Sequence, residues 1–119
     1  MAKKSGPQDR QESGKPHARQ ERPLVRLERS LTTENLWIYI LSLLSRQRMH
    51  AYAVMGEMER SFGWKPGLIT PYVVMYKLEE DGFIKGSDKG RRRYYYITQK
   101  GKELLKKARK RLRETADSV

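Results

Sequence analysis

The sequence predicts a small α+β protein that is mainly α-helical and contains one β-hairpin. Three observations predict this class. Four segments of the chain have the apolar patterns of helices. Two short segments typical of strands flank a stretch that contains Asp and Gly, which predicts a hairpin turn. The length of 119 residues is that of about one domain, which can bury one modest core.

The positive charge of the chain is concentrated at its C-terminal end. The formal net charge is +12 at neutral pH. Residues 1–30 hold 8 Lys or Arg and 4 Asp or Glu, residues 31–81 hold 5 and 6, and residues 82–119 hold 13 and 4. Such a balance favours a polyanionic partner, with nucleic acid as the first choice and an anionic membrane surface as the second.

Residues 1–30 are predicted to form a disordered basic arm. Up to Pro23 the only apolar residues are Met1, Ala2 and Ala18. They are too few to offset the entropy lost on ordering the segment. Two roles stay open for this arm, namely contact with the polyanion and simple solubilisation.

Neither a secretory signal nor a membrane span is predicted. No apolar segment follows the basic N-terminus, and the longest apolar stretch, Leu36–Leu44, is too short to cross a bilayer. We therefore expect a cytoplasmic protein with no membrane partner. The absence of cysteine excludes disulfides and cysteine-based zinc sites, and His17 and His50 lie far apart in different contexts. No metal or cofactor is expected.

The first two helices are predicted over the middle of the chain. Thr32 or Thr33 is the expected cap of the first, which runs to Leu44 and is apolar around nearly its whole circumference. It is therefore the central helix, or one of its faces meets a partner subunit, or both. The second helix is predicted from about His50 to Phe62, with Gly63 ending it.

The third helix has the clearest boundaries. Thr70 is the expected N-cap, Pro71 suits the first helical position, and Gly82 ends the helix. Its predicted core side holds Pro71, Val74, Met75 and Leu78. The opposite side shows Val73, Tyr76, Lys77 and Glu80, with Tyr72 at its edge. Contact with DNA explains these outward apolar and aromatic residues, and ordinary surface scatter is the alternative.

A hairpin and a last helix complete the chain. Residues 83–85 and 92–97 are the predicted strands, joined by residues 86–90. Four cations lie at or beside the predicted tip: Lys89, Arg91, Arg92 and Arg93. Because like charges repel, this arrangement suits a loop laid along phosphates better than it suits stability. Thr98 caps the last helix, whose apolar stripe of Gly101, Leu104, Leu105, Ala108 and Leu112 is expected to pack on the first helix.

Three helices, a hairpin with a basic tip and a further helix are the order of a winged helix-turn-helix with a C-terminal dimerisation helix. The sequence resembles the PadR-like transcriptional regulators over roughly residues 36–105. The resemblance rests on residues 49–52, on 70–72 with 78–84, and on 90–98 with Gly101. The chain departs from the family at Ala51, which replaces a Gly, and at residues 71–73, where Pro-Tyr-Val replaces Leu-Tyr-Pro.

The resemblance implies a homodimer that places two recognition helices in successive major grooves of DNA, most simply as a repressor. Residues 31–97 would be the DNA-binding domain and 98–119 the dimerisation helix. The expected DNA contacts are Thr70, Tyr72, Val73, Tyr76 and Lys77, with Lys89, Arg91, Arg92, Arg93 and Tyr94 of the hairpin. The expected dimer contacts are Leu36, Trp37, Ile40, Leu105, Ala108 and Leu112.

Two other functions stay open, namely an RNA-binding or ribosome-associated winged helix and an architectural chromatin protein with little sequence preference. An enzyme is not expected, because the chain has no Ser/His/Asp set and no Gly-rich loop for phosphate. A small-molecule effector is not indicated. Trp37 either lines a pocket for one or, as we expect, packs as a structural residue, and the last helix has no aromatic residue.

Overall fold

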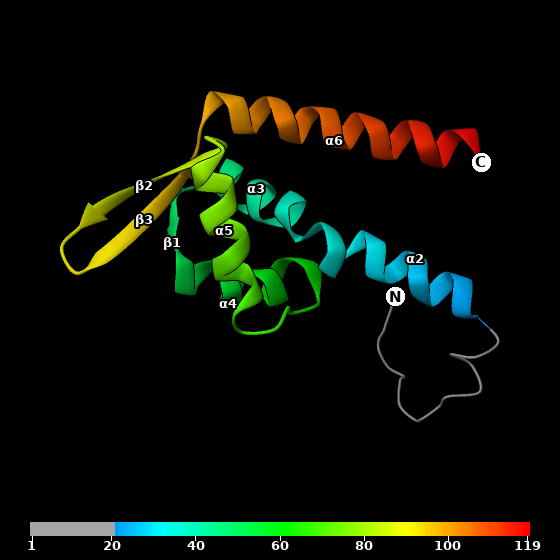
Figure 1. The fold of residues 1–119 in the computed structure, drawn as a ribbon, viewed down its shortest axis with the longest axis horizontal. Coiled ribbons are helices and arrows are strands. Elements are labelled where there is room, and N and C mark those ends of the chain that lie inside the picture. The colour runs from blue at the N-terminus through cyan, green and yellow to red at the C-terminus, as the bar shows by residue number, and fades with distance from the viewer. Residues whose placement is uncertain (1–20) are drawn as a thin grey trace. The chain divides into compact units, whose positions relative to one another are not determined.

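The computed structural model describes residues 21–119, which fall into two compact units that meet between Glu34 and Asn35. Figure 1 shows the elements. The described part of the first unit contains the helix α2 (Arg22–Leu31), and the short 3-10 helix η1 (Thr33–Asn35) spans the boundary. The second unit holds all the other elements.

Helix α2 was not expected, and the prediction of disorder is wrong for residues 22–30. Pro23 lies in the first turn, where a missing N–H costs nothing. Leu24, Leu27 and Leu31 then recur along one side of the helix and are about half exposed. These leucines begin just after the polar stretch on which the prediction rested, so a helical stripe was missed. The rest of the predicted arm, residues 1–20, lies outside the described residues.

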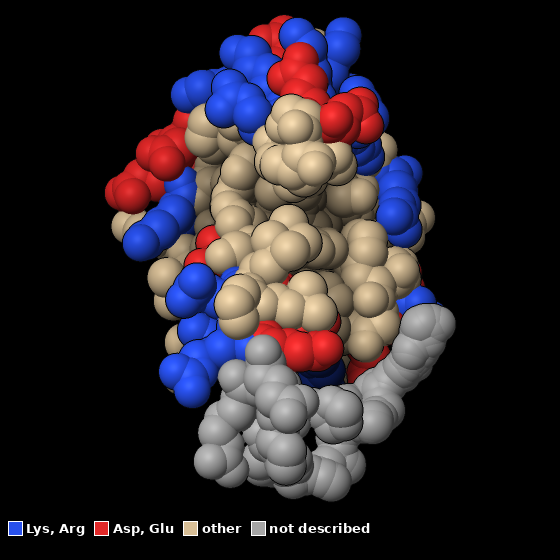
Figure 2. All heavy atoms as spheres, turned by 90° about the vertical axis from the view of Figure 1, so that its right-hand side faces the viewer, with Lys and Arg blue, Asp and Glu red and all other residues tan. Residues whose placement is uncertain are grey.

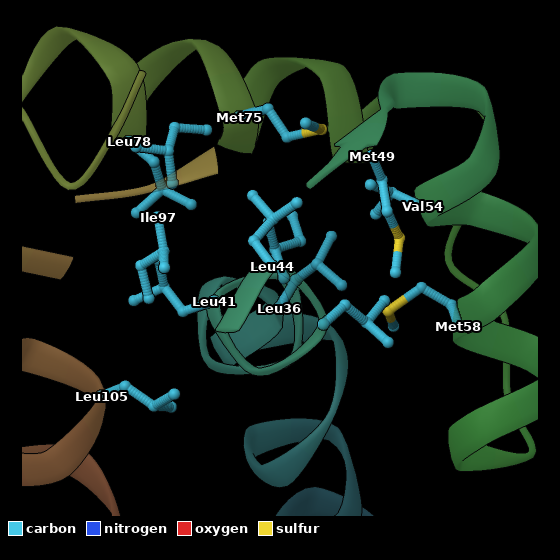
Figure 3. Packing of buried hydrophobic residues seen from close by; sticks show 13 residues of the cluster. Leu36, Leu41, Leu44, Met49, Val54, Met58, Met75, Leu78, Ile97 and Leu105 are labelled. Carbon is cyan, nitrogen blue, oxygen red and sulfur yellow. The ribbon is translucent and has the colours of Figure 1, made fainter. Parts of the chain in front are cut away.

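The second unit is built around the helix α3 (Leu36–Arg46), which packs against three helices and the sheet. The other elements are β1 (Met49–His50), α4 (Ala51–Phe62), α5 (Thr70–Glu80), β2 (Ile84–Lys89), β3 (Arg92–Ile97) and α6 (Gln99–Ser118). Figure 3 shows Leu36, Leu41 and Leu44 of α3 among buried side chains of α4, α5, β3 and α6. Helix α3 is apolar all round because it is the centre of the core.

This packing corrects part of the predicted dimer interface. Leu36, Ile40 and Leu105 are at most 2% exposed within the chain itself. They cannot also touch a partner subunit. The first half of α6 packs on α3 of the same chain, so that part of the apolar stripe is used internally.

Two predicted helix caps are also wrong. Asn35, at the end of η1, precedes α3, whereas Thr32 or Thr33 was expected to cap it. Ile69 precedes α5, and Thr70 is the first helical residue, with no side chain capping that end. The first residue of a helix shifts easily by one or two positions, and neither of these ends has a side-chain cap that would fix it.

The sheet has three antiparallel strands in the order β1-β3-β2. Strand β1 was not predicted, since two residues show no periodicity. Strands β2 and β3 pair from Ile84 opposite Ile97 to Lys89 opposite Arg92. The turn is therefore only Gly90–Arg91, with φ of +66° at Gly90, and the predicted loop over residues 86–90 is too long.

Helix α6 begins where the sequence predicted, with Thr98 Oγ1 accepting the Gly101 N–H at 3.1 Å. Gly101 is required there because a Cβ would overlap the carbonyl oxygen of Phe83. From residue 109 onward every residue of α6 is exposed. Figure 1 shows this half of α6 running on past the other helices of its unit. One half of the helix therefore holds the fold, and the other half is open to other partners.

Candidate nucleic-acid interface

Helix α5 presents the two sides that its sequence predicts. Pro71, Met75 and Leu78 are buried in the core. Tyr72, Val73, Tyr76 and Lys77 all lie on the exposed side, where the Tyr76 side chain is 66% exposed. An exposed apolar and aromatic side on a short helix gains nothing from the core of its own domain. It is the side available to a partner.

The start of α5 offers fewer backbone donors than expected. Pro71 has no N–H, and the N–H groups of Tyr72 and Val73 both donate to the carbonyl oxygen of Ile69, at 3.1 and 3.3 Å. Among the first three residues of α5, only the exposed Thr70 thus has an N–H that does not donate to the Ile69 carbonyl oxygen. Phosphate contact at this end would rest on Thr70 and on the Tyr72 hydroxyl.

Three exposed apolar or aromatic residues escaped the predicted site. Leu68 and Ile69 immediately precede α5 and are largely exposed. Tyr52, the second residue of α4, is 78% exposed. Tyr52 closes the segment 49–52 on which the family resemblance partly rests, so that segment was the signal that could have singled it out.

The β2–β3 hairpin, or wing, has two faces that differ in charge. Alternate residues point to opposite faces of a strand, so Arg93, Tyr95 and Ile97 share the face that carries the buried Ile97. We call this the inner face. Arg92, Tyr94 and Tyr96 share the other, outer face.

The inner face holds Arg93 between two carboxylates. Arg93 Nη2 donates to Glu79 Oε2 of α5 at 2.7 Å, and Nη1 donates to Asp88 Oδ1 of β2 at 3.1 Å. The Glu79 bond first, and then the Asp88 bond, raise the pKa of the Arg93 guanidinium above its usual value. The same Glu79 oxygen accepts the Gly86 N–H at 3.3 Å. Arg93 therefore joins the wing to α5, which makes it a weaker candidate for the predicted DNA contact than Arg91 and Arg92.

The outer face carries cations without such partners. Lys89 lies directly opposite Arg92, and like charges in that position destabilise a hairpin. Arg91 occupies the turn beside them. Among residues 21–119 no carboxylate forms an ion pair with Lys89, Arg91 or Arg92. An anion supplied from outside would relieve their repulsion.

His50 links the outer face to the start of α4. Its Nδ1 accepts the Ala53 N–H at 3.3 Å, and its Nε2 lies 2.9 Å from Arg92 Nη1. Arginine can only donate, and a neutral imidazole has one accepting nitrogen, so His50 cannot make both bonds at full strength at once. The hold on Arg92 is therefore incomplete, and Arg92 is able to leave it for a stronger acceptor.

Tyr94 is a packing residue. It is half-buried, and its ring meets the His50 ring edge-on, with 5.6 Å between centroids. This packing makes Tyr94 a weaker candidate for the predicted contact with DNA than the exposed residues of the wing. The neighbouring Tyr96 is the more exposed of the two tyrosines on this face.

Helix α5 and the wing are joined through Glu79. Tyr72, Tyr76 and Glu79 follow one another at steps of four and three residues along one side of α5, and Glu79 is bonded to the wing. The exposed tyrosines thus lead from the start of α5 towards the hairpin. We call Thr70, Tyr72, Val73, Tyr76 and Lys77 of α5, with Lys89, Arg91 and Arg92 of the wing, the α5–wing surface.

The remaining predicted dimer contacts differ in exposure. Trp37 is half-buried against the core and donates from Nε1 to Asn35 Oδ1 at 3.1 Å. Ala108 is half-buried, and Leu112 is 42% exposed. These three residues keep surface that a second subunit can cover.

Residues 21–119 contain no group of three His, Asp or Glu side chains placed to hold a metal ion. Within that same range, no helix combines the length and apolar character needed to cross a membrane.

Comparison with known proteins decides the family. The model of the transcriptional regulator PadR-like family matches residues 40–107, more than half of the chain. This chain belongs to the PadR-like family. It is a transcriptional regulator and not an enzyme, as the sequence predicted. No curated protein sequence matches it significantly.

Solved structures share the fold. A PadR family regulator from Eggerthella lenta has a TM-score of 0.71 at 24% identity, covering 85% of this chain and 92% of its own. A transcriptional regulator from Clostridium thermocellum has a TM-score of 0.68 at 24% identity, covering 75% of this chain and 90% of its own. A PadR family regulator from Clostridium difficile has a TM-score of 0.62 at 22% identity, covering 69% of this chain and 91% of its own. The winged-helix fold class is confirmed, with a C-terminal helix in place.

Proposed function

We propose that this PadR-like regulator binds a specific sequence of double-stranded DNA as a homodimer, and that it represses transcription at the nucleoid in the cytoplasm. The observation that carries the proposal is the α5–wing surface. It comprises an exposed aromatic and apolar side of α5 and, on the wing, three cations with no carboxylate partner among the described residues. Duplex DNA supplies both matching features, base edges in a groove and phosphates beside it.

Each part of the α5–wing surface has its own task in this proposal. The first turns of α5 enter the major groove, where the Val73 methyl groups can touch a thymine methyl. Tyr76 and Lys77 reach base edges or backbone, and Thr70 and Tyr72 bond phosphate oxygens and so set the register. Lys89, Arg91 and Arg92 lie along the flanking backbone or in the minor groove.

The homodimer is supported by the second half of α6. Residues 109–118 are helical, yet no other part of their unit buries them. A helical segment of this length is marginal in water without packing. A partner subunit that covers Ala108, Leu112 and the exposed edge of Trp37 would supply that packing. Sedimentation of the protein before and after Leu112→Glu tests this, with a shift from dimer towards monomer as the expected result.

Selection from a random duplex pool tests the DNA proposal. The full chain should enrich a sequence with two-fold symmetry, and Val73→Ala should change the enriched bases while leaving the salt dependence of binding unaltered. Structured RNA added as competitor should displace the duplex poorly. Equal enrichment of all sequences would favour an architectural protein, and preference for RNA would favour the RNA-binding alternative. Transcription from a promoter carrying the selected site should fall when the protein is added.

A further inference from the structure

Helix α6 carries a row of four cations that the α5–wing surface does not use. Lys102, Lys106, Arg109 and Arg113 follow one another at steps of four, three and four residues. This spacing places them along one flank of a helix, and all four are exposed. We call them the α6 row. Of the acidic residues of α6, Glu103 lies three residues before Lys106 and Asp117 four residues after Arg113, so both neighbour the row, whereas Glu114 pairs with Lys110.

The α6 row lacks internal compensation. The ion pair found on α6 joins Lys110 to Glu114 at 3.7 Å, and none in the described part of the chain involves the row. Like charges at steps of three and four residues destabilise a helix. A cation in the first turn also opposes the helix dipole, and no acidic residue in that turn offsets Lys102. The row therefore lowers the stability of α6 unless an anion from outside binds it.

The α6 row is separate from the start of α5. Helix α6 packs on α3 through its apolar stripe, which the row adjoins but does not share. Figure 1 shows α6 along the edge of its unit opposite the end at which α5 begins. Figure 2 shows Lys and Arg side chains at the top of the molecule, where α6 lies, with Asp and Glu side chains among them. A straight duplex held at the start of α5 leaves this edge free.

We propose that the α6 row binds the phosphate backbone of a second segment of duplex DNA without sequence preference, so that one regulator holds two segments at once. The row contains only long cationic side chains, and α6 has no aromatic residue. Single strands are usually held by stacking on aromatic rings, and membrane surfaces by an inserted apolar side chain, and the row offers neither. The inference rests on the proposed function only for the site of the first segment.

A bridging assay with the full chain tests the α6 row. One duplex of arbitrary sequence is fixed to beads, and a second, fluorescent duplex is captured through the protein at low salt. The row variant Lys106→Gln, Arg109→Gln has a matched control in Lys107→Gln, Arg111→Gln. Both remove two charges from the same stretch of α6, and glutamine keeps helix propensity. Circular dichroism checks helicity, and Arg109→Gln beside Arg111→Gln repeats the comparison should either double variant lose helix.

The row variant should bind the fixed duplex but capture about tenfold less of the second one, because the cations that it removes are the ones that hold the second duplex. The control should capture within about twofold of the original protein, since its cations lie off the row. Equal capture by the row variant, or equal loss by the control, overturns the inference. Displacement of the second duplex by anionic vesicles or double-stranded RNA more readily than by DNA overturns the choice of partner.

The wing variant Lys89→Gln, Arg91→Gln, Arg92→Gln separates this inference from the proposed function. If the inference holds, this variant still binds one duplex weakly, through the α6 row. Suppose that the wing variant binds no duplex at all and the row variant bridges normally. The inference about the α6 row is then wrong, and the proposed function of the α5–wing surface stands. Suppose instead that the wing variant binds as before and the row variant binds nothing. The α6 row is then supported as a DNA site, and the proposed function of the α5–wing surface is wrong.

Discussion

Both faces of the wing carry cations, but only the cation of the inner face is paired with carboxylates. On the inner face, Arg93 is bonded to Glu79 and Asp88, and the face is closed against α5. On the outer face, Lys89 opposes Arg92, which is restrained by the incomplete hydrogen bond that it donates to His50. Of the three consecutive arginines, Arg93 thus stabilises the fold, whereas Arg91 and Arg92 remain available to bind an anion. Strand alternation, rather than the number of cations, decides which of them is available to DNA.

The largest expected effect comes from neutralising the outer face. Lys89→Gln, Arg91→Gln, Arg92→Gln should weaken binding to any duplex by about a hundredfold or more near 0.1 M salt. The slope of log affinity against log salt should become shallower by about 0.9 for each phosphate that the wing no longer neutralises. The free energy of unfolding should stay equal or rise, because the repulsion between Lys89 and Arg92 is removed. Affinity measured by fluorescence anisotropy over a salt series checks this, and an unchanged slope would mean that these wing cations do not contact the phosphates.

Neutralising the inner face should give the opposite pattern. Arg93→Gln should lower the free energy of unfolding, because Glu79 and Asp88 lose their shared partner, and should leave the salt slope of DNA binding as it was. Urea unfolding beside the anisotropy series checks both parts, with Arg91→Gln as the matched control. A double-mutant cycle with Glu79→Gln should show that the two changes are not additive. A salt slope that flattens as much as in the control would place Arg93 on the DNA.

A smaller effect is expected at Gly86. A Cβ there would lie 2.5 Å from Arg93 Nε, so Gly86→Ala must displace the guanidinium from its two carboxylates. Because the obstacle is the end of a flexible side chain, the loss of stability in urea unfolding should be less than that of Arg93→Gln. Once Arg93 is already Gln, Gly86→Ala should stabilise the strand by about 0.5 kcal/mol, as alanine usually does relative to glycine. Destabilisation in both backgrounds would contradict the close approach of the two residues.

The smallest effect is expected at Tyr94. Its ring packs on His50, so Tyr94→Phe keeps the packing and should change duplex affinity by less than about twofold, under the effect of removing one net hydrogen bond. The same anisotropy assay checks this. A tenfold decrease in affinity would restore Tyr94 to the DNA interface.

Local patterns in the sequence were enough for much of the fold. The spacing of apolar residues predicted α4, α5 and α6, and glycines marked their ends or turns, as at Gly63 and Gly82 with their positive φ. The exposed side of α5 followed from the same spacing. These features depend on neighbours within one or two turns, which a single sequence displays.

What escaped prediction depends on contacts between distant segments. The pairing of Arg93 with Glu79 joins residues 14 positions apart in different elements. Leu36 and Leu105 were assigned to a dimer because an apolar residue does not reveal whether its own chain or another will cover it. Strand β1 exists only because β3 lies beside it, with Met49 opposite Tyr95. In each case the sequence named the residue but not its partner.

An NMR titration with the selected duplex, followed at the Nε–H resonances of Arg91, Arg92 and Arg93, shows which face of the wing contacts DNA. We expect the Arg91 and Arg92 signals to shift as duplex is added, together with the methyl signals of Val73, while the Arg93 signal stays in place. A shifted Arg93 signal beside unmoved signals of Arg91 and Arg92 would mean that the inner face, and not the outer one, binds the duplex.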